Sequence, residues 1–159
     1  MSTRCSTTTT RRAASSNGRT GLRTLLIDSS VLIAGAVPGD GRRADAATAL
    51  TAYRGRHMRV PVSILAETMG FILRRAGVHH QRVFWDAFMR SGIELVPADQ
   101  DLIGHARDID RAYSDVGLCF ADCTLLAACE TLRCDTVLSF DRRLAVYKPS
   151  FARELTVLP

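Results

Sequence analysis

Four carboxylates stand out in this sequence because each lies where an apolar, strand-like run gives way to a helix-like run, or just inside that helix. They are Asp28, Glu67, Asp122 and Asp141. In a parallel α/β sheet the strand ends and the helix N-termini meet at one edge, so acids far apart in sequence can gather there. Several acids at such an edge make a pocket for a divalent cation, and a pocket of this kind supports phosphodiester hydrolysis.

Each acid alone also has an ordinary structural explanation. Asp28, Asp122 and Asp141 fall at predicted helix starts, where a carboxylate caps free backbone N–H groups. Glu67 is different, because its neighbours one helical turn away are apolar and a desolvated acid needs compensation. Clustered carboxylates would repel one another, and a bound cation would relieve that repulsion. An oxygen-only ligand set favours Mg²⁺ or Mn²⁺.

The elements that position these acids alternate between strands and helices. Strands are predicted at 22–28, 58–62, 93–96, 136–139 and, at an edge, 155–158; helices are predicted after residue 28, at 44–53, 64–76, 81–90, 99–113 and 121–132, and in a short segment opened by Asp141. Leu25, Leu26 and Ile27 form the continuous apolar run expected of a strand buried on both faces. The pattern predicts an α/β, three-layer fold, with a mostly parallel central sheet of about four to five strands and helices on both faces.

The net charge of +5 belongs to the N-terminal segment and not to the predicted fold. Residues 1–24 hold five arginines and no acid, whereas residues 25–159 hold 15 Arg, one Lys and 16 acids. The basic balance therefore does not indicate nucleic-acid binding by the fold itself. Residues 1–21 have no hydrophobic periodicity, so we expect a disordered basic tail there and a single domain at 22–159. A transit segment and a misassigned start codon are alternative interpretations of the tail.

The cysteines and the hydropathy favour a cytoplasmic protein without a membrane partner. The five cysteines are odd in number, form no C-x-x-C pair and follow no secretory signal, which is typical of reduced thiols. The longest apolar stretches are too short to span a bilayer.

Four segments resemble the acidic blocks of PIN-domain ribonucleases, in the order of that family. They are LLIDSSVLIA (25–34), VSILAETMGFILRR (62–75), FADCTLLAAC (120–129) and TVLSFDRRL (136–144). Size and block spacing are most similar to those of the VapC toxins of bacterial toxin–antitoxin pairs, although the Arg-rich extension before the first strand departs from that pattern. The resemblance implies a PIN-like fold and assigns metal-binding, catalytic roles to Asp28, Glu67, Asp122 and Asp141, with Ser30 and Ser139 as the accompanying hydroxyls.

The same resemblance implies a function and partners. We expect an endoribonuclease that hydrolyses RNA with Mg²⁺ or Mn²⁺, a VapB-like antitoxin that lies across a groove between the helices at 44–53 and 64–76, and a homodimer. Arg42, Arg43, Arg142 and Arg143 flank the acidic blocks and are candidates for binding RNA phosphates. As solvated surface charges they would need no such role.

Three alternatives remain open on the sequence. A PIN-like module could bind RNA or a partner without cleaving, and a PIN nuclease could process RNA without being a toxin. A phosphoryl-accepting receiver domain also has acids at strand ends, but it needs a late lysine in the sheet, and Lys148 near the C-terminus is the single lysine of the chain. The stretch 77–90 matches nothing diagnostic, and we interpret its two histidines as surface residues and Trp85 as a core residue.

Overall fold

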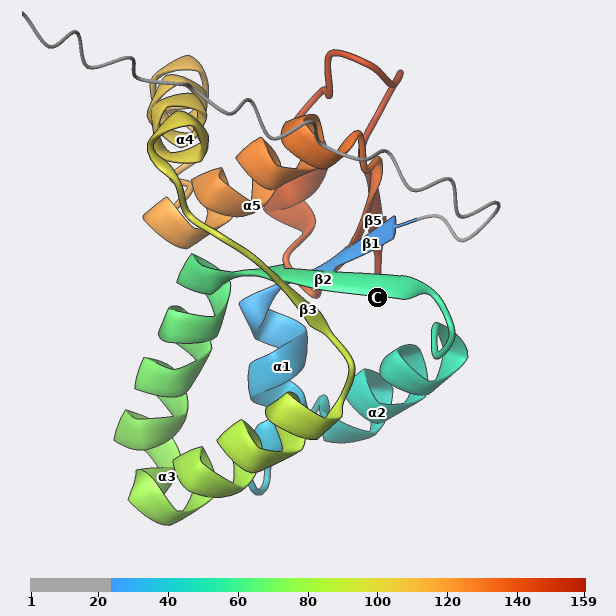
Figure 1. Cartoon of the computed structure of the whole chain (residues 1–159), viewed down its shortest axis with the longest axis vertical. Coiled ribbons are helices and arrows are strands. Elements are labelled where there is room, and N and C mark those ends of the chain that lie inside the picture. Colours follow the sequence, from blue (N-terminus) through green and yellow to red (C-terminus); the bar gives the residue numbers. More distant parts are fainter. Residues whose placement is uncertain (1–23) are drawn as a thin grey trace, which may run out of the picture.

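The computed structural model describes residues 24–159, and its centre is a five-stranded sheet in which each paired strand runs parallel to its neighbour. The strands are β1 (Thr24–Ile27), β2 (His57–Pro61), β3 (Glu94–Val96), β4 (Thr136–Leu138) and β5 (Thr156–Leu158), and their order is β3-β2-β1-β4-β5 (Figure 1). The central strand β1 pairs with β2 and β4, as in the partners Leu25↔Met58 and Ile27↔Leu138. The predicted parallel sheet, with its last strand at an edge, is confirmed.

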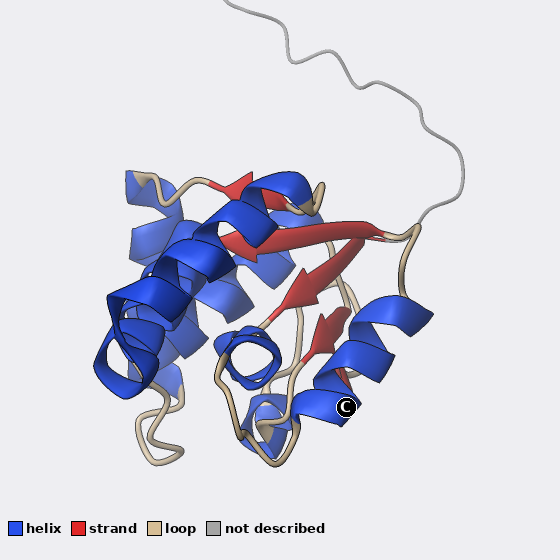
Figure 2. Ribbon diagram, turned by 90° about the horizontal axis from the view of Figure 1, so that it is seen from below, coloured by secondary structure: helices blue, strands red, loops and turns tan. Residues whose placement is uncertain are grey.

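Helices cover both faces of this sheet. One side carries α1 (Ser29–Ala36), α2 (Arg43–Ala52) and α3 (Val62–Arg90), and the other carries α4 (Gln100–Ala112) and α5 (Phe120–Leu132) (Figures 1 and 2). Helix α1 packs against both α2 and α3, and α4 packs against α5. A short 3₁₀ segment, η1 (Arg142–Val146), follows β4. The predicted three-layer α/β architecture is confirmed.

The core explains why the central elements are apolar on all sides. Leu25, Leu26 and Ile27 of β1 are fully buried because the strand is covered on both faces. Helix α5 is buried continuously from Ala121 to Cys129, since it packs between the sheet and α4 and also contacts α3. These two buried elements carry Asp28 and Asp122 at their ends, so the core fixes the positions of both carboxylates.

Helix α3 is interrupted where the sequence predicts a break. The two helices expected at 64–76 and 81–90 are present as two helical arms within Val62–Arg90, and they meet at a sharp kink at Gly77, where φ is 83° and ψ is 172°. This non-helical conformation is accessible in practice only to glycine, so Gly77 allows the chain to turn between the two arms. Trp85, expected in the core, is 54% exposed in the second half of α3, so that expectation was wrong.

Glu130, near the end of α5, forms hydrogen bonds with residues 147–150 of the segment that follows η1. Its carboxylate accepts hydrogen bonds from the Tyr147 hydroxyl at 2.8 Å and from the Ser150 N–H and hydroxyl at 2.7 and 2.6 Å. Partial burial acts to raise the pKa of Glu130, but the hydrogen bonds from Ser150 and Tyr147 outweigh it and the net pKa is lowered. Glu130 therefore stabilises the native fold in its ionised form.

Two expectations concern the chain as a whole. The expected disordered tail at residues 1–21 lies outside the described residues. Within residues 24–159, no helix is both long enough and apolar enough to cross a membrane.

Candidate functional site

Asp28 is a buried carboxylate at the carboxyl end of the central strand. Its backbone N–H donates to the Leu138 carbonyl of β4 at 3.0 Å, so strand pairing fixes the residue. Its Oδ2 accepts hydrogen bonds from the hydroxyls of Ser30 and Ser139, the latter at 2.7 Å, and the residue is only 2% exposed. Among the described residues no cationic side chain pairs with Asp28. The two serine hydroxyls expected beside the acids thus hold a buried anion that has no protein counter-ion in this part of the chain.

Asp122 lies in the first turn of α5 and is 6% exposed. Its Oδ2 accepts the backbone N–H of Cys119 at 2.8 Å, while its own N–H points to the Cys119 sulfur at 3.5 Å. The two residues form a capping box, with cysteine in the place usually taken by serine or threonine. The capping interpretation of Asp122 is therefore correct, and the same bonds fix the carboxylate at the edge of the sheet.

Glu67 reaches the site from α3 and is half-buried. The Cys119 thiol donates to its Oε1 at 3.7 Å, which connects α3 to the start of α5. A hydroxyl–hydroxyl hydrogen bond between Ser63 and Thr124 joins the same two helices close by. The N-cap position of α3 is Pro61, so the Ser63 hydroxyl is free to make this contact with α5.

The Cys119 thiol is a further member of the site. Packing around the thiol desolvates the thiolate and raises the pKa of Cys119 to about 11, although the residue as a whole is exposed; the carboxylates of Asp122 and Glu67 add to the rise. The thiol therefore stays protonated at neutral pH and can donate to Glu67. The pattern C-x-x-D before an apolar run is the sequence signal that could have indicated Cys119, and it was missed.

Asp141 caps η1 and forms an ion pair with Arg143. The Arg143 Nη2 lies 2.6 Å from Asp141 Oδ2, and Nε donates to both carboxylate oxygens at 3.0 and 3.1 Å. The same guanidinium donates to the Gly117 carbonyl at 2.9 Å and lies 3.9 Å from Asp122 Oδ2. The Arg143 guanidinium beside it is the main reason that the pKa of Asp141 is lowered. Arg143, a candidate RNA-binding residue, is thus an intramolecular counter-ion of two of the acids.

The four predicted acids lie along one continuous path of contacts at the carboxyl edge of the sheet. Ser139 connects Asp28 to Asp141. Arg143 connects Asp141 to Asp122. Cys119 connects Asp122 to Glu67. Within residues 24–159, however, no group of three or more His, Cys, Asp or Glu side chains lies close enough together to hold a metal ion. The fold gathers the acids at one edge without closing them into a three-ligand shell.

The other candidate arginines have different surroundings. Arg42 packs over the ring of Phe140, with its guanidinium carbon 5.4 Å from the ring centroid. Arg43 lines an apolar groove between α1, α2 and the second half of α3. The side chain of Arg142 is exposed and forms no hydrogen bond or ion pair with the described residues. Of the four, Arg42 and Arg143 contact residues of the 139–141 segment.

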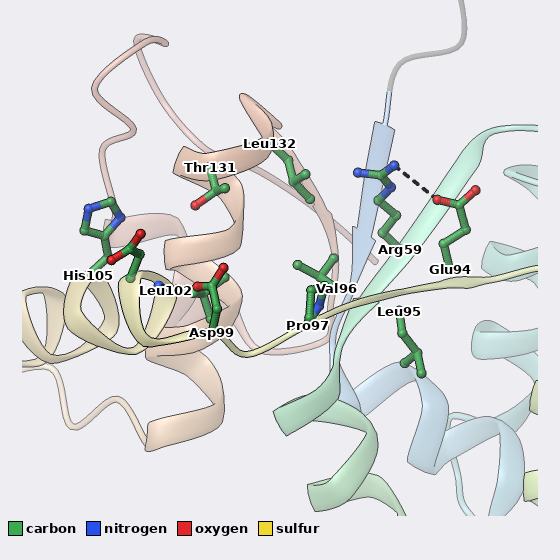
Figure 3. Close-up of a pocket in the computed structure, with 11 residues that line it drawn as sticks. Arg59, Glu94, Leu95, Val96, Pro97, Asp99, Leu102, His105, Thr131 and Leu132 are labelled. Atoms are coloured by element: carbon green, nitrogen blue, oxygen red, sulfur yellow. Dashed lines mark hydrogen bonds and ion pairs between the residues drawn. The ribbon is translucent and has the colours of Figure 1, made fainter. Parts of the chain in front are cut away.

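A pocket of about 570 Å³ lies apart from the acids, between the β2–β3 edge and the α4–α5 pair (Figure 3). It contains Arg59, whose Nη2 pairs with Glu94 at 3.1 Å and whose buried Nε has no hydrogen-bond partner. None of Asp28, Glu67, Asp122 and Asp141 lines this pocket. Its volume is therefore no reason to place the active site there.

Fold and edge together define a class of protein: a parallel α/β domain with carboxylates collected at the carboxyl ends of its strands. The model of the family described as the PIN domain matches residues 25–148. The chain belongs to the PIN-domain family. A comparison with curated proteins finds no significant match.

Several solved structures have the same fold. VapC20 of Mycobacterium tuberculosis, described as a sarcin-ricin loop cleaving toxin, is 19% identical, with a TM-score of 0.71 over 81% of this chain and 98% of that one. FitAcB from Neisseria gonorrhoeae is 17% identical, with a TM-score of 0.60 over 85% and 96%. A toxin–antitoxin complex from Klebsiella pneumoniae is 20% identical, with a TM-score of 0.56 over 74% and 86%. The expected VapC-type PIN fold is confirmed.

Proposed function

We propose that this chain is a metal-dependent endoribonuclease of the VapC type and that its catalytic edge contains Asp28, Glu67, Asp122 and Asp141. The single observation that supports this most strongly is Asp28. A carboxylate that is 2% exposed, that receives only neutral hydroxyl and N–H donors, and that has no cationic partner among the described residues requires positive charge from elsewhere. A bound divalent cation supplies that charge.

The side chains fit Mg²⁺ or Mn²⁺ by their chemistry, because all four are oxygen donors. Mg²⁺ is commonly held by one or two carboxylates and keeps several waters, so this ion does not need three protein ligands in contact. Asp28 and Asp122, the two buried acids, would be its direct ligands, and Glu67 and Asp141 would complete the site directly or through water. When bound, the cation lowers the pKa of a water molecule and stabilises charge on phosphate oxygens.

The residues of this chain have separate tasks in that reaction. The hydroxyls of Ser30 and Ser139 hold the Asp28 carboxylate in one orientation, and the capping box does the same for Asp122. Arg143, 53% exposed, would bind a phosphate oxygen of the RNA once the cation neutralises the acids it now contacts. RNA, rather than DNA, follows from the family.

The test is cleavage of a panel of RNAs by the purified chain with Mg²⁺, Mn²⁺ or EDTA. Asp28→Asn and Asp122→Asn should each abolish cleavage, because an amide removes the anionic ligand while it keeps the shape of the side chain. Asp86→Asn, a change at an exposed acid on α3, is the matched control and should cleave normally. Cleavage that survives in EDTA, or in either active-edge variant, would sink the mechanism.

One observation favours the alternative of a PIN-like module that binds RNA without cleaving it. Arg143 already neutralises Asp141 and lies 3.9 Å from Asp122, so these two acids have a counter-ion without any metal. That alternative predicts that EDTA leaves RNA binding unchanged and that no RNA is cleaved in the presence of Mg²⁺ or Mn²⁺.

We infer that the partner that restrains this activity is a VapB-like antitoxin and that the site of action is the cytoplasm. An apolar groove of about 410 Å³ supports an antitoxin site, with Leu32, Leu50, Val83 and Phe84 among its lining residues. The groove runs between α1, α2 and the second half of α3. In the antitoxin site proposed here, residues 80–88 therefore form the α3 side, and not residues 64–76 as expected from the sequence. Growth arrest on expression, relieved by co-expression of the adjacent open reading frame, tests this proposal; growth arrest by Asp122→Asn as well would contradict it.

The expected homodimer stays a proposal, supported by an apolar stripe on α3. Val78, Trp85 and Met89 are spaced along one side of the helix and are 50, 54 and 70% exposed. Light scattering coupled to size exclusion should give twice the chain mass, and Trp85→Glu should shift it to the mass of one chain. A wild-type protein that elutes at the mass of one chain at micromolar concentration would refute the dimer.

A further inference from the structure

A groove of about 440 Å³ follows α2 and ends beside Phe140. Phe140 borders the carboxyl edge of the sheet that holds Asp28, Glu67, Asp122 and Asp141, called the acidic edge below. Arg42 and Asp45 line the groove near the start of α2, Tyr53 lines it near the end, and Phe140 and Pro159 close it from the β4 and β5 side. None of the four acids lines the groove, so it is a separate feature of the surface.

Phe140 connects the groove to the acids. It lies between Ser139, which donates to Asp28, and Asp141, and its own N–H donates to the Ser30 hydroxyl at 3.0 Å. The backbone on either side of the ring is therefore fixed by the hydrogen bonds that orient Asp28.

Two aromatic residues that line the groove, Phe140 and Tyr53, are each paired with an arginine. The Arg42 guanidinium carbon lies 5.4 Å from the centroid of the Phe140 ring, and the Arg56 guanidinium carbon lies 5.5 Å from that of Tyr53. Aromatic rings and guanidinium planes are the surfaces on which unpaired nucleic-acid bases stack, and arginines beside them bind the phosphates. Because Phe140 and Tyr53 both line the groove, bases of one strand can use both platforms.

Charge supports the same ligand. Residues 40–56 carry four arginines and two aspartates, and all four arginines are exposed. The acidic edge itself repels phosphates, so an RNA chain needs positive charge beside that edge to remain bound. Arg42 supplies such charge beside Phe140, the neighbour of Ser139 and Asp141, although the fold as a whole is close to neutral.

We propose that this groove binds the single-stranded RNA that flanks the scissile phosphodiester, with bases stacked on Phe140 and Tyr53 and phosphates held by Arg42 and Arg56. The proposal rests on the ribonuclease function proposed above and extends it to the form of the substrate. A duplex cannot place its bases on these rings, so unpaired RNA is the preferred substrate.

The test is fluorescence anisotropy with labelled single-stranded oligoribonucleotides and a labelled RNA duplex. The full-length chain carries Asp122→Asn in all samples, and the buffer contains EDTA, so that binding is measured without cleavage. Phe140→Leu and Tyr53→Leu, which keep apolar volume but remove the ring, should each weaken single-strand binding roughly five- to 150-fold, the equivalent of ~1–3 kcal/mol per stacked base. Duplex binding should change less.

Matched variants separate stacking from general damage. Phe140→Tyr keeps the ring and should keep the affinity. Phe151→Leu removes the ring of another arginine–aromatic pair, formed with Arg133, that does not line the groove, and it should also keep the affinity. Circular dichroism and thermal melts identify any variant that does not fold. If Phe140→Leu is unfolded, Tyr53→Leu and Arg42→Ala carry the test alone.

Each outcome bears on one proposal. If the wild-type chain cleaves RNA while Phe140→Leu and Tyr53→Leu bind single strands as tightly as the parent, the groove proposal is overturned and the nuclease remains. If RNA binds and the two variants lose affinity while no cation supports cleavage, the nuclease fails and the RNA groove remains. If the variants change only the oligomeric mass, the groove is a contact between protein chains and the proposal is overturned.

Discussion

Removal of Arg143 tests most directly how the negative charge of Asp141 and Asp122 is neutralised. Its guanidinium makes three close contacts with the Asp141 carboxylate, donates to the Gly117 carbonyl and lies 3.9 Å from Asp122. The neighbouring Arg142 is exposed and makes no ion pair with the described residues, so Arg142→Ala is a control of equal net charge for Arg143→Ala.

Two opposite effects are expected from Arg143→Ala. The folded state loses an ion pair and a hydrogen bond; because the side chain is 53% exposed, we expect a loss of only about 1–2 kcal/mol in the free energy of unfolding. Affinity for a divalent cation should rise, because a positive charge near Asp122 and Asp141 is gone. A unit charge at ~4 Å in a water-like dielectric contributes about 1 kcal/mol, which corresponds to a roughly fivefold tighter dissociation constant.

The assay is a Mn²⁺ titration by calorimetry, with thermal melts in EDTA and at saturating Mn²⁺. Arg143→Ala should melt a few degrees below wild type in EDTA. It should gain more from Mn²⁺ than wild type does, since the stabilisation by a ligand grows with the logarithm of the ratio of its concentration to its dissociation constant. Arg142→Ala should follow wild type in both. Equal Mn²⁺ affinity in all three proteins would refute the view that Arg143 competes with the cation, and a weaker affinity in Arg143→Ala would mean that it positions Asp141 as a ligand.

The remaining predictions concern stability. The folded-state pKa of Glu130 is lowered, so its contribution to stability is present above the unfolded pKa near ~4.3 and is lost as the pH falls through the folded value. Glu130→Gln should therefore lower the free energy of unfolding by about 1–2 kcal/mol at pH 7, because the hydrogen bonds from Tyr147 and Ser150 lose their charged acceptor. In denaturant titrations this deficit should shrink below about pH 4. A deficit that does not depend on pH would contradict the ionised state. Gly77→Ala should lower the free energy of unfolding by about 1–3 kcal/mol because φ is 83° there. Gly104→Ala, inside α4 with open space around its Cβ, should raise it by about 0.5–1 kcal/mol. Equal effects of the two substitutions would refute the kink assignment. Removal of residues 1–21 should leave the melting temperature unchanged, and a large drop would refute the disordered tail.

Much of the fold could be predicted because its signals are local. The run Leu25 to Ile27 indicated a strand buried on both faces, and the alternation of strands with helices indicated a parallel sheet; both are present. Element boundaries agree within a few residues for the same reason. The break between the helices at 64–76 and 81–90 was predicted and lies at Gly77. The exposure of Trp85 was not predicted, because a helical pattern does not state which side of a helix remains without a partner.

The sequence by itself determined the four acids, their order and their positions at the ends of strands and the starts of helices, because capping patterns and apolar runs depend on neighbours within a few residues. Tertiary structure alone decided what touches them. Cys119 meets Glu67 across 52 positions, and Ser139 meets Asp28 across 111. Such contacts depend on how the sheet edge closes, which no local pattern encodes. The same packing placed Arg143 between two of the acids and formed the groove beside Phe140. The charge around these acids and the groove proposed to bind RNA therefore depend on the tertiary structure.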